Sequence, residues 1–201
     1  MRIEEAILGR RSIRRFDGRP VPAEVVAALI ALACTAPAPH HSRPWRFFDL
    51  ASPQTRDRLT KAMSAAWHQD LENDGVDPET IPNLLEGSRR KLSEPPTLLL
   101  ACIVQEGARQ WMDDRRRRAE RDMYVQSLGA ALQNLMLAAH ARGLASYLMA
   151  APLFCVKAVR QAFELPADHE PLFLIALGYP LPGVTLPPRP EIQVEDFLFD
   201  R

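Results

Sequence analysis

The stretch MYVQSLGAALQNLMLAAHA, residues 123–141, decides how this chain folds. It predicts a helix that is apolar on almost all sides and rich in alanine and glycine. Such a helix belongs in the interior of a protein, where its small residues let neighbouring backbones approach closely. A charged half precedes it, so that we expect one long helix over residues 110–142, which Gly143 ends.

Apolar runs on both sides of this helix predict the strands of a buried sheet. The expected strands are 46–51, 97–104, 145–150 and 172–178. The expected further helices are 1–9, 22–33, 53–71, 78–92 and 156–163. Because strands and helices do not alternate in strict βαβ order, the pattern predicts the α+β class. The length of 201 residues and the hydrophobic content of 47% favour a single domain over residues 1–201.

The C-terminal arm, about residues 180–201, contains five prolines and cannot be regular before Val194. It nevertheless ends in the apolar run Phe197, Leu198 and Phe199. An extended apolar tail must dock on something, and a partner subunit is a plausible surface for it.

Composition excludes several classes of protein. With 25 basic and 25 acidic residues, the chain has no global field that would hold nucleic acid or an anionic membrane. The most apolar stretch is interrupted by polar side chains and does not predict a membrane span. Cys34, Cys102 and Cys155 lie far apart in apolar stretches, which favours reduced, buried thiols in a cytoplasmic protein.

The common catalytic motifs are absent from the sequence. There is no dinucleotide fingerprint, no P-loop, no H-E-x-x-H and no nucleophile elbow. His40 and His41 are neighbours, and adjacent side chains rarely chelate one ion, so we expect no metal site. An enzyme without a protein nucleophile suggests a cofactor that brings its own reactivity.

Two segments carry the candidate chemistry. The first is RRSIRRF, residues 10–16, whose guanidinium groups and serine hydroxyl match the oxygens of a phosphate. The alternative for this segment is a solvated basic turn. The second is APAPHHSRPW, residues 36–45, in which a rigid loop leads to Trp45 and has unpaired backbone groups that are available to a ligand. Its alternative is a plain helix-to-strand connection with Trp45 in the core.

These two segments are followed by LGAALQNL at 128–135, ARGLA at 141–145 and IALGYP at 175–180. The same segments occur in this order in nitroreductase-like flavoproteins, which the chain resembles over essentially its whole length. The resemblance implies a central, mostly antiparallel sheet packed by helices, and FMN as the cofactor. It also implies an intertwined homodimer with exchanged C-terminal arms and the flavin at the subunit interface.

Carried onto this sequence, the resemblance places Arg10, Ser12 and Arg14 on the FMN, with Arg11 as a weaker candidate. It assigns Arg189 to the phosphate as well, and Leu148, Met149 and Ala150 to the strand end beside the flavin ring. Pro37, Ala38, Pro39 and His41 would reach the flavin of the other subunit. No protein side chain is predicted to be catalytic, because the chemistry resides at N5 of the flavin.

A narrower likeness is to the C-terminal domain of the bifunctional coenzyme F-420 gamma-glutamyl ligase, through the paired histidines and Arg43. It implies reduction of the dehydro precursor of that deazaflavin coenzyme. The alternatives are a general NAD(P)H-dependent nitro- or quinone reductase, and a non-catalytic flavin or deazaflavin binding protein. The electron donor would be NAD(P)H or a reduced deazaflavin.

The run Arg115–Arg118 supports two interpretations. The first is a solvated helix face balanced by Asp113, Asp114, Glu120 and Asp122 through i,i+4 pairs. The second is a clamp in which Arg116 and Arg117 hold an anionic substrate. A nucleic-acid site is disfavoured by the zero net charge and the scarcity of interleaved aromatic residues.

Overall fold

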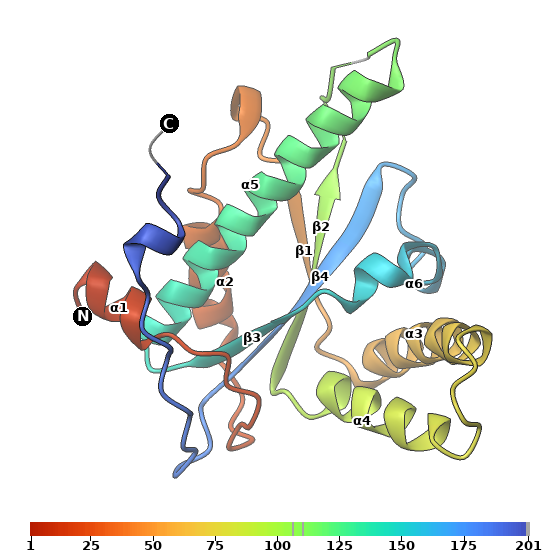
Figure 1. Cartoon of the computed structure of the whole chain (residues 1–201), viewed down its shortest axis with the longest axis horizontal. Coiled ribbons are helices and arrows are strands. Elements are labelled where there is room, and N and C mark those ends of the chain that lie inside the picture. The colour runs from red at the N-terminus through yellow and green to blue at the C-terminus, as the bar shows by residue number, and fades with distance from the viewer. Residues whose placement is uncertain (106, 110, 200–201) are drawn as a thin grey trace.

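A computed structural model describes residues 1–105, 107–109 and 111–199. Its sheet contains β1 (Trp45–Asp49), β2 (Thr97–Val104), β3 (Ala145–Met149) and β4 (His169–Gly178). The strand order is β1-β2-β4-β3, and every neighbouring pair is antiparallel (Figure 1). The predicted α+β class with an antiparallel sheet is therefore confirmed.

Helices cover both faces of this sheet, because all eight residues of β2 are buried and their side chains alternate between the faces. Leu99, Ala101 and Ile103 pack towards α2 (Ala23–Ala33) and α5 (Asp114–Ala141). Leu98 and Leu100 pack towards the opposite layer. That layer consists of α3 (Pro53–Asn73), α4 (Ile81–Ser93) and α6 (Val156–Ala162) (Figure 1).

Helix α5 confirms the expectation of one long helix with two unlike halves. Its buried residues begin at Glu120 and continue to Ala139, and Gly143 follows its end with a φ of 74°. The helix begins at Asp114 because the side chain of Asp113 accepts a hydrogen bond from the backbone N–H of Arg116. Residue 110 of the predicted helix lies outside the described residues.

Several predicted boundaries are wrong by a few residues for local reasons. Strand β1 ends at Asp49 rather than 51, since the Ser52 hydroxyl caps α3 by accepting from the backbone N–H of Thr55. Helix α4 begins at Ile81 rather than 78, because the Asp77 carboxylate forms a turn with the N–H of Glu79. Pro22 precedes α2 as its cap instead of occupying its first position.

Strand β4 begins at His169, three residues before its predicted start. The extra residues pair with the end of β2, where His169 lies opposite Val104. Glu170 is also held from α5, because it accepts hydrogen bonds from the guanidinium of Arg121. Tertiary contacts thus lengthen this strand beyond its apolar run.

Helix α1 (Ile3–Gly9) ends at the predicted glycine, but its apolar residues do not join the core. Ala6 is buried, whereas Ile3, Ile7 and Leu8 are 62%, 47% and 71% exposed. The C-terminal arm is also apolar and exposed at Phe197, and it is irregular until the short 3-10 helix η3 (Val194–Asp196), as predicted. Residues 200–201 of the arm lie outside the described residues.

The cysteines differ from their prediction. Cys102 is buried, and its burial raises the pKa of the thiol to about 12. Cys34 and Cys155 are only half-buried, so the expectation of three buried thiols is wrong for these two. All three are free thiols. Within the part of the chain that the structure describes, no helix is long and apolar enough to cross a membrane.

Candidate flavin site

The arginine segment, residues 10–16, is held against helix α5 at its start and against the sheet farther along. At its start, a Cβ on Gly9 would lie 2.6 Å from Nε2 of His140, so a larger residue in α1 would require the His140 ring on α5 to shift. In its middle, the backbone N–H of Ile13 donates to the carbonyl of Ser146 on β3, at 3.2 Å. The segment therefore runs beside β3, to which an isolated parallel bridge between Ser12 and Ser146 joins it.

The end of the segment is fixed by an aromatic contact. Phe16 stacks on Tyr147 with ring centroids 6.1 Å apart, and a Cβ on Gly178 would lie 2.7 Å from the Phe16 ring. The guanidinium of Arg14 lies 5.7 Å from the centroid of the same tyrosine ring. The Tyr147 hydroxyl donates to the carbonyl of Lys91, and burial raises its pKa to about 12. Tyr147 is thus a neutral, fixed support for the segment.

A hollow of about 600 Å³ lies between this segment and the C-terminal arm. Five of the predicted FMN-binding residues line it: Arg10, Arg11, Ser12, Arg14 and Arg189. The guanidinium of Arg189 donates to the backbone carbonyl of Arg10, which joins the arm to the segment. The arm contributes the remaining lining residues, namely Leu186, Pro187, Pro190, Glu191, Ile192, Asp196 and Phe197.

The electrostatics of this hollow suit an anion. Burial, and then the like charges of Arg189 and Arg11, lower the pKa of Arg10. Glu191 and Asp196, which sequence reasoning missed, supply only two carboxylates against four guanidinium groups. A phosphate would relieve the remaining repulsion and could accept bidentate hydrogen bonds from the arginines and one from Ser12. The donor set fits the phosphate of FMN.

A solvated basic turn does not account for this arrangement. Arg15 is exposed and does not line the hollow, so it fits that interpretation. Arg10 and Arg11 are half-buried, and the exposed Ser12, Arg14 and Arg189 line the hollow with them. Arg189 lies 179 residues from Arg10 in the sequence and still contacts it. Convergence from such distant positions favours a binding role over simple solvation.

The proline loop carries unusual backbone strain. His40, His41 and Arg43 have φ values of 56°, 55° and 47°, in the left-handed region that residues other than glycine seldom adopt. Each such residue costs about 1 kcal/mol or more, and such strain is concentrated at functional sites. Trp45, which follows the loop, is buried and donates from Nε1 to Sγ of Cys34. Its burial matches the plain-connection alternative, but the strain does not.

The proline loop and the hollow lie at opposite ends of the sheet. The start of β1 pairs with the end of β2 at Trp45 and Ile103, and the backbone N–H of Val104 donates to Pro44, the last residue of the loop. The hollow lies where β3 begins and β4 ends. Eight residues of β2, at about 3.4 Å per residue, place these ends about 25 Å apart. One chain therefore does not bring Pro37, Ala38, Pro39 and His41 to the arginine segment.

Leu148, Met149 and Ala150 lie at the end of β3, two to four residues beyond Ser146, the serine that pairs with the arginine segment. Leu148 and Met149 are half-buried, and Ala150 is exposed. These residues do not line the hollow with the arginines. They follow it along the same strand, which is the arrangement expected if the phosphate lies in the hollow and the ring lies farther along β3.

Arg116 and Arg117 are both engaged within the first turn of α5. Arg116 pairs with Asp113 and Arg117 with Asp114, so the predicted i,i+4 spacing is wrong and the pairs are i,i+3. Glu120 is 4% exposed and accepts from the backbone N–H of Arg109 and from Nε1 of Trp111. It therefore does not balance the arginine run. Sequence reasoning missed its role, although its position four residues before the buried Tyr124 places it on the inner face of the helix.

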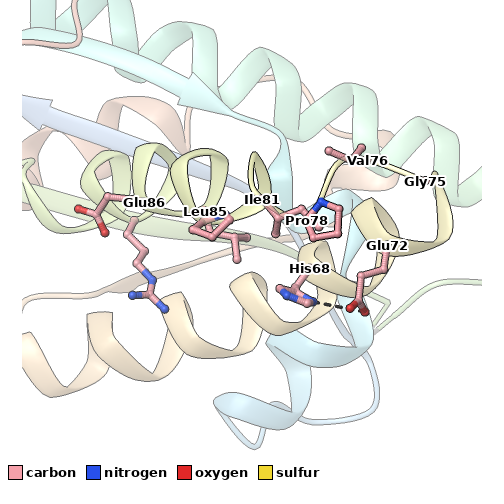
Figure 2. Close-up of a pocket in the computed structure, with 10 residues that line it drawn as sticks. His68, Glu72, Gly75, Val76, Pro78, Ile81, Leu85 and Glu86 are labelled. Atoms are coloured by element: carbon pink, nitrogen blue, oxygen red, sulfur yellow. Dashed lines mark ion pairs between the residues drawn. The ribbon is translucent and has the colours of Figure 1, made fainter.

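A second hollow, of about 700 Å³, lies between α3 and α4. Figure 2 shows His68 and Glu72 on its wall, and Ile81 and Leu85 on the facing helix. Nδ1 of His68 lies 3.4 Å from the carboxylate of Glu72. None of the predicted FMN-binding residues lines it. Among the described residues, no group of side chains could hold a metal ion.

Residues 7–179 match the model of the Nitroreductase family. An iodotyrosine deiodinase from Drosophila melanogaster is 31% identical over 194 residues, which cover 92% of this chain and 65% of that protein. The protein named "Putative NADH dehydrogenase/NAD(P)H nitroreductase" from Methanothermobacter thermautotrophicus is 30% identical over 182 residues, 90% of this chain and 78% of that protein.

Among solved structures, the FMN-dependent nitroreductase NfnB from Mycobacterium smegmatis, in complex with NADPH, superposes with a TM-score of 0.71. It is 21% identical, and the match covers 98% of this chain and 97% of that chain, which shows a common fold. These relatives bear the names of deiodinases and nitroreductases rather than that of the F-420 ligase. The broad resemblance is confirmed, whereas the narrower one is not supported.

Proposed function

This chain belongs to the nitroreductase family, and we propose that within it the protein reduces small electron-poor ring compounds, nitroaromatics or quinones, with NAD(P)H as the electron donor. Family membership confirms the predicted class, an FMN-dependent oxidoreductase. The substrate and the individual residue roles form part of the proposal. The relatives support this general reductase over the F-420 precursor reductase.

One observation carries the proposal, namely the convergence of four arginines and Ser12 on one hollow. Arg10 and Arg189 come from the two ends of the chain, and their like charges are left close together until an anion binds between them. Such a site binds a phosphate tightly through charge-assisted hydrogen bonds. The hollow is thus the proposed anchor for the FMN phosphate.

We infer that the complete site requires two copies of the chain. The proline loop lies about 25 Å from the hollow of its own chain, at the other end of the sheet. A second copy could present its loop to the ring of a flavin anchored by the first. The exposed apolar residues of α1 and of the arm, among them Leu8 and Phe197, are the surfaces that such a pair would cover.

In this arrangement the protein binds and orients, and it donates no nucleophile. FMN, when bound, supplies hydride transfer. The arginines hold the phosphate, β3 supports the ring through Leu148 and Met149, and the strained loop contributes fixed backbone groups from the other subunit. Because the loop is already ordered in its unfavourable conformation, little entropy is lost when it meets the flavin.

Reconstitution with FMN tests the proposal. The purified protein is expected to bind FMN, to be reduced by NADPH or NADH, and to turn over anaerobically with a nitroaromatic and a quinone. The dehydro precursor of coenzyme F-420 and 3-iodotyrosine serve as comparison substrates. Faster turnover of either one than of the nitroaromatic would replace the proposed substrate class, and FMN binding without turnover of any would indicate a carrier.

The dimer has its own test. Sedimentation equilibrium of the full chain is expected to give a dimer, and a chain lacking residues 191–201 is expected to dissociate at concentrations at which the full chain does not. Phe197→Ser with Phe199→Ser provides a milder variant of the same change. A monomeric full chain that still binds FMN fully would contradict the two-copy site.

A further inference from the structure

Trp111, which does not line the hollow beside the arginine segment, is held in place by two hydrogen bonds and two cation–π contacts. The indole Nε1 of Trp111 donates to the carboxylate of Glu120, and its backbone carbonyl accepts from the guanidinium of Arg117 at 2.8 Å. The guanidinium of Arg116 lies 4.6 Å from its ring centroid. That of Arg109 lies 5.8 Å from the centroid. The ring is therefore fixed relative to α5.

Packing alone does not explain this arrangement. Trp111 is only half-buried, although two hydrogen bonds and two cation–π contacts hold it. Arg116 and Arg117 are balanced by Asp113 and Asp114. In residues 1–105, 107–109 and 111–199, by contrast, no carboxylate pairs with the side chain of Arg109. A fixed aromatic ring, with a cation near it that no described carboxylate balances, is a surface for a ligand.

The position of Trp111 connects it with the strained loop. The segment that carries it leaves the sheet at the end of β2, and the loop enters the sheet at the start of β1, beside it. The hydrogen bond from Val104 to Pro44 joins the two segments at 2.6 Å. The 3-10 helix η1 (Pro39–His41) in the loop also lies against α5. Trp111 and His41 therefore belong to the same end of the molecule.

We propose that Trp111 and Arg109 select the substrate, and that they favour a planar aromatic molecule with a negative charge, such as an aromatic carboxylate. This inference rests on the proposed function, because the loop must reach a flavin for Trp111 to lie beside the reacting molecule. An aromatic ring stacks on the indole with an offset, and a carboxylate pairs with the guanidinium of Arg109. Glu120 acts as a positioning residue, since its carboxylate accepts hydrogen bonds from Trp111 and from the backbone of Arg109.

The test compares benzoate with benzamide, a neutral molecule of the same shape. Both are titrated into the FMN-loaded protein by calorimetry, and KM is measured for 4-nitrobenzoate and nitrobenzene. We expect benzoate to bind at least about tenfold more tightly than benzamide, within the range of one charge-assisted hydrogen bond. Arg109→Gln should abolish this preference without weakening benzamide, and Trp111→Leu should weaken both ligands about tenfold.

Controls separate a selective role from a structural one. Arg58→Gln removes another cation–π pair, whose guanidinium lies 5.5 Å from the Phe163 ring, and should change neither ligand. Glu120→Gln should weaken both ligands less than Trp111→Leu does, because the glutamine can still accept the indole hydrogen bond. Equal affinity for the two ligands, no binding of benzoate, or a preference that survives Arg109→Gln overturns the inference. Failure of the wild-type protein to bind FMN overturns the proposed function instead.

Discussion

The two ends of the sheet differ in how they are prepared for a ligand. At the end where β3 begins, backbone geometry is ordinary. There, His140 lies close to Gly9 and the Phe16 ring lies close to Gly178, so that both ends of the run of arginines are fixed. At the end where β1 begins, charge is mostly paired, and the backbone itself is strained at His40, His41 and Arg43. One end therefore stores electrostatic repulsion and the other stores conformational strain.

This difference shows how one chain can supply two unlike parts of a site. Repulsion among arginines is relieved by any phosphate, so that end is expected to govern affinity. Strained loops hold groups in one geometry, so the opposite end is expected to govern orientation and choice of substrate. Variants at each end should then have effects of different kinds.

The largest effect is expected from the arginine end. Replacement of both Arg10 and Arg189 by glutamine should weaken FMN binding at least about 100-fold, because each charge-assisted hydrogen bond contributes about 1.5–3 kcal/mol. Quenching of FMN fluorescence measures the dissociation constant. Arg15→Gln, a matched change at an exposed neighbour, should leave it unaltered. Equal losses of FMN affinity in the two variants would support the alternative interpretation of the segment as a solvated basic turn.

The next effect concerns the close approach at Gly178. A methyl group there would lie 2.7 Å from the Phe16 ring and 2.9 Å from Pro96, so Gly178→Ala should lower the free energy of unfolding by about 1–3 kcal/mol. Urea denaturation measures it. Gly129→Ala, on α5 with nothing within 4 Å of the new methyl, should instead be neutral or slightly stabilising. Similar behaviour of the two variants would show that the approach is not tight.

At the loop end, the expected effect on stability has the opposite sign. His40→Gly should raise the free energy of unfolding by about 1 kcal/mol, since glycine adopts a φ of 56° without strain. Chemical denaturation of the protein without FMN measures this. Ala38→Gly, at a φ of −139°, relieves nothing and should destabilise. If His40→Gly is destabilised, contacts of the imidazole stabilise the loop by more than the backbone strain at His40 costs.

The smallest effect concerns Tyr147, which supports Phe16 and Arg14. Tyr147→Phe should cost about 1 kcal/mol near pH 8 through the lost hydrogen bond to Lys91. The folded-state pKa of Tyr147 is raised to about 12, above its ordinary value near 10, so its contribution is complete below pH 10 and is lost as the pH rises towards 12. Urea denaturation at pH 8 and pH 11 should therefore show the gap between wild type and variant closing.

Much of the fold could be predicted because the physical signals were local. The apolar run of residues 123–141 predicted the central helix, and Gly9 and Gly143 marked helix ends that the structure confirms. Boundaries that depend on partners distant in sequence were wrong. Strand β4 is extended by pairing with β2 and by the contact of Glu170 with Arg121, and neither is visible in a window of neighbouring residues.

The candidate site divides in the same way. The arginine segment could be predicted as a candidate anion site, because several guanidinium groups follow one another in the sequence. The roles of Trp111 and Glu120 could not be predicted in this way. Their importance depends on an indole that meets a buried carboxylate nine residues later, and on a loop that approaches from β1. Apolar periodicity likewise predicted a face for α1, but it could not indicate that Ile3 and Leu8 face outwards.

The sequence by itself determined the class of fold, the buried central helix, the irregular arm and a candidate anion-binding segment, because these follow from periodicity, proline and charge within short stretches. Only the tertiary structure decided that Arg189 joins Arg10 at one end of the sheet while the proline loop lies at the other. That separation depends on strand order and register, which are set by pairing between distant residues and by the shared core they bury.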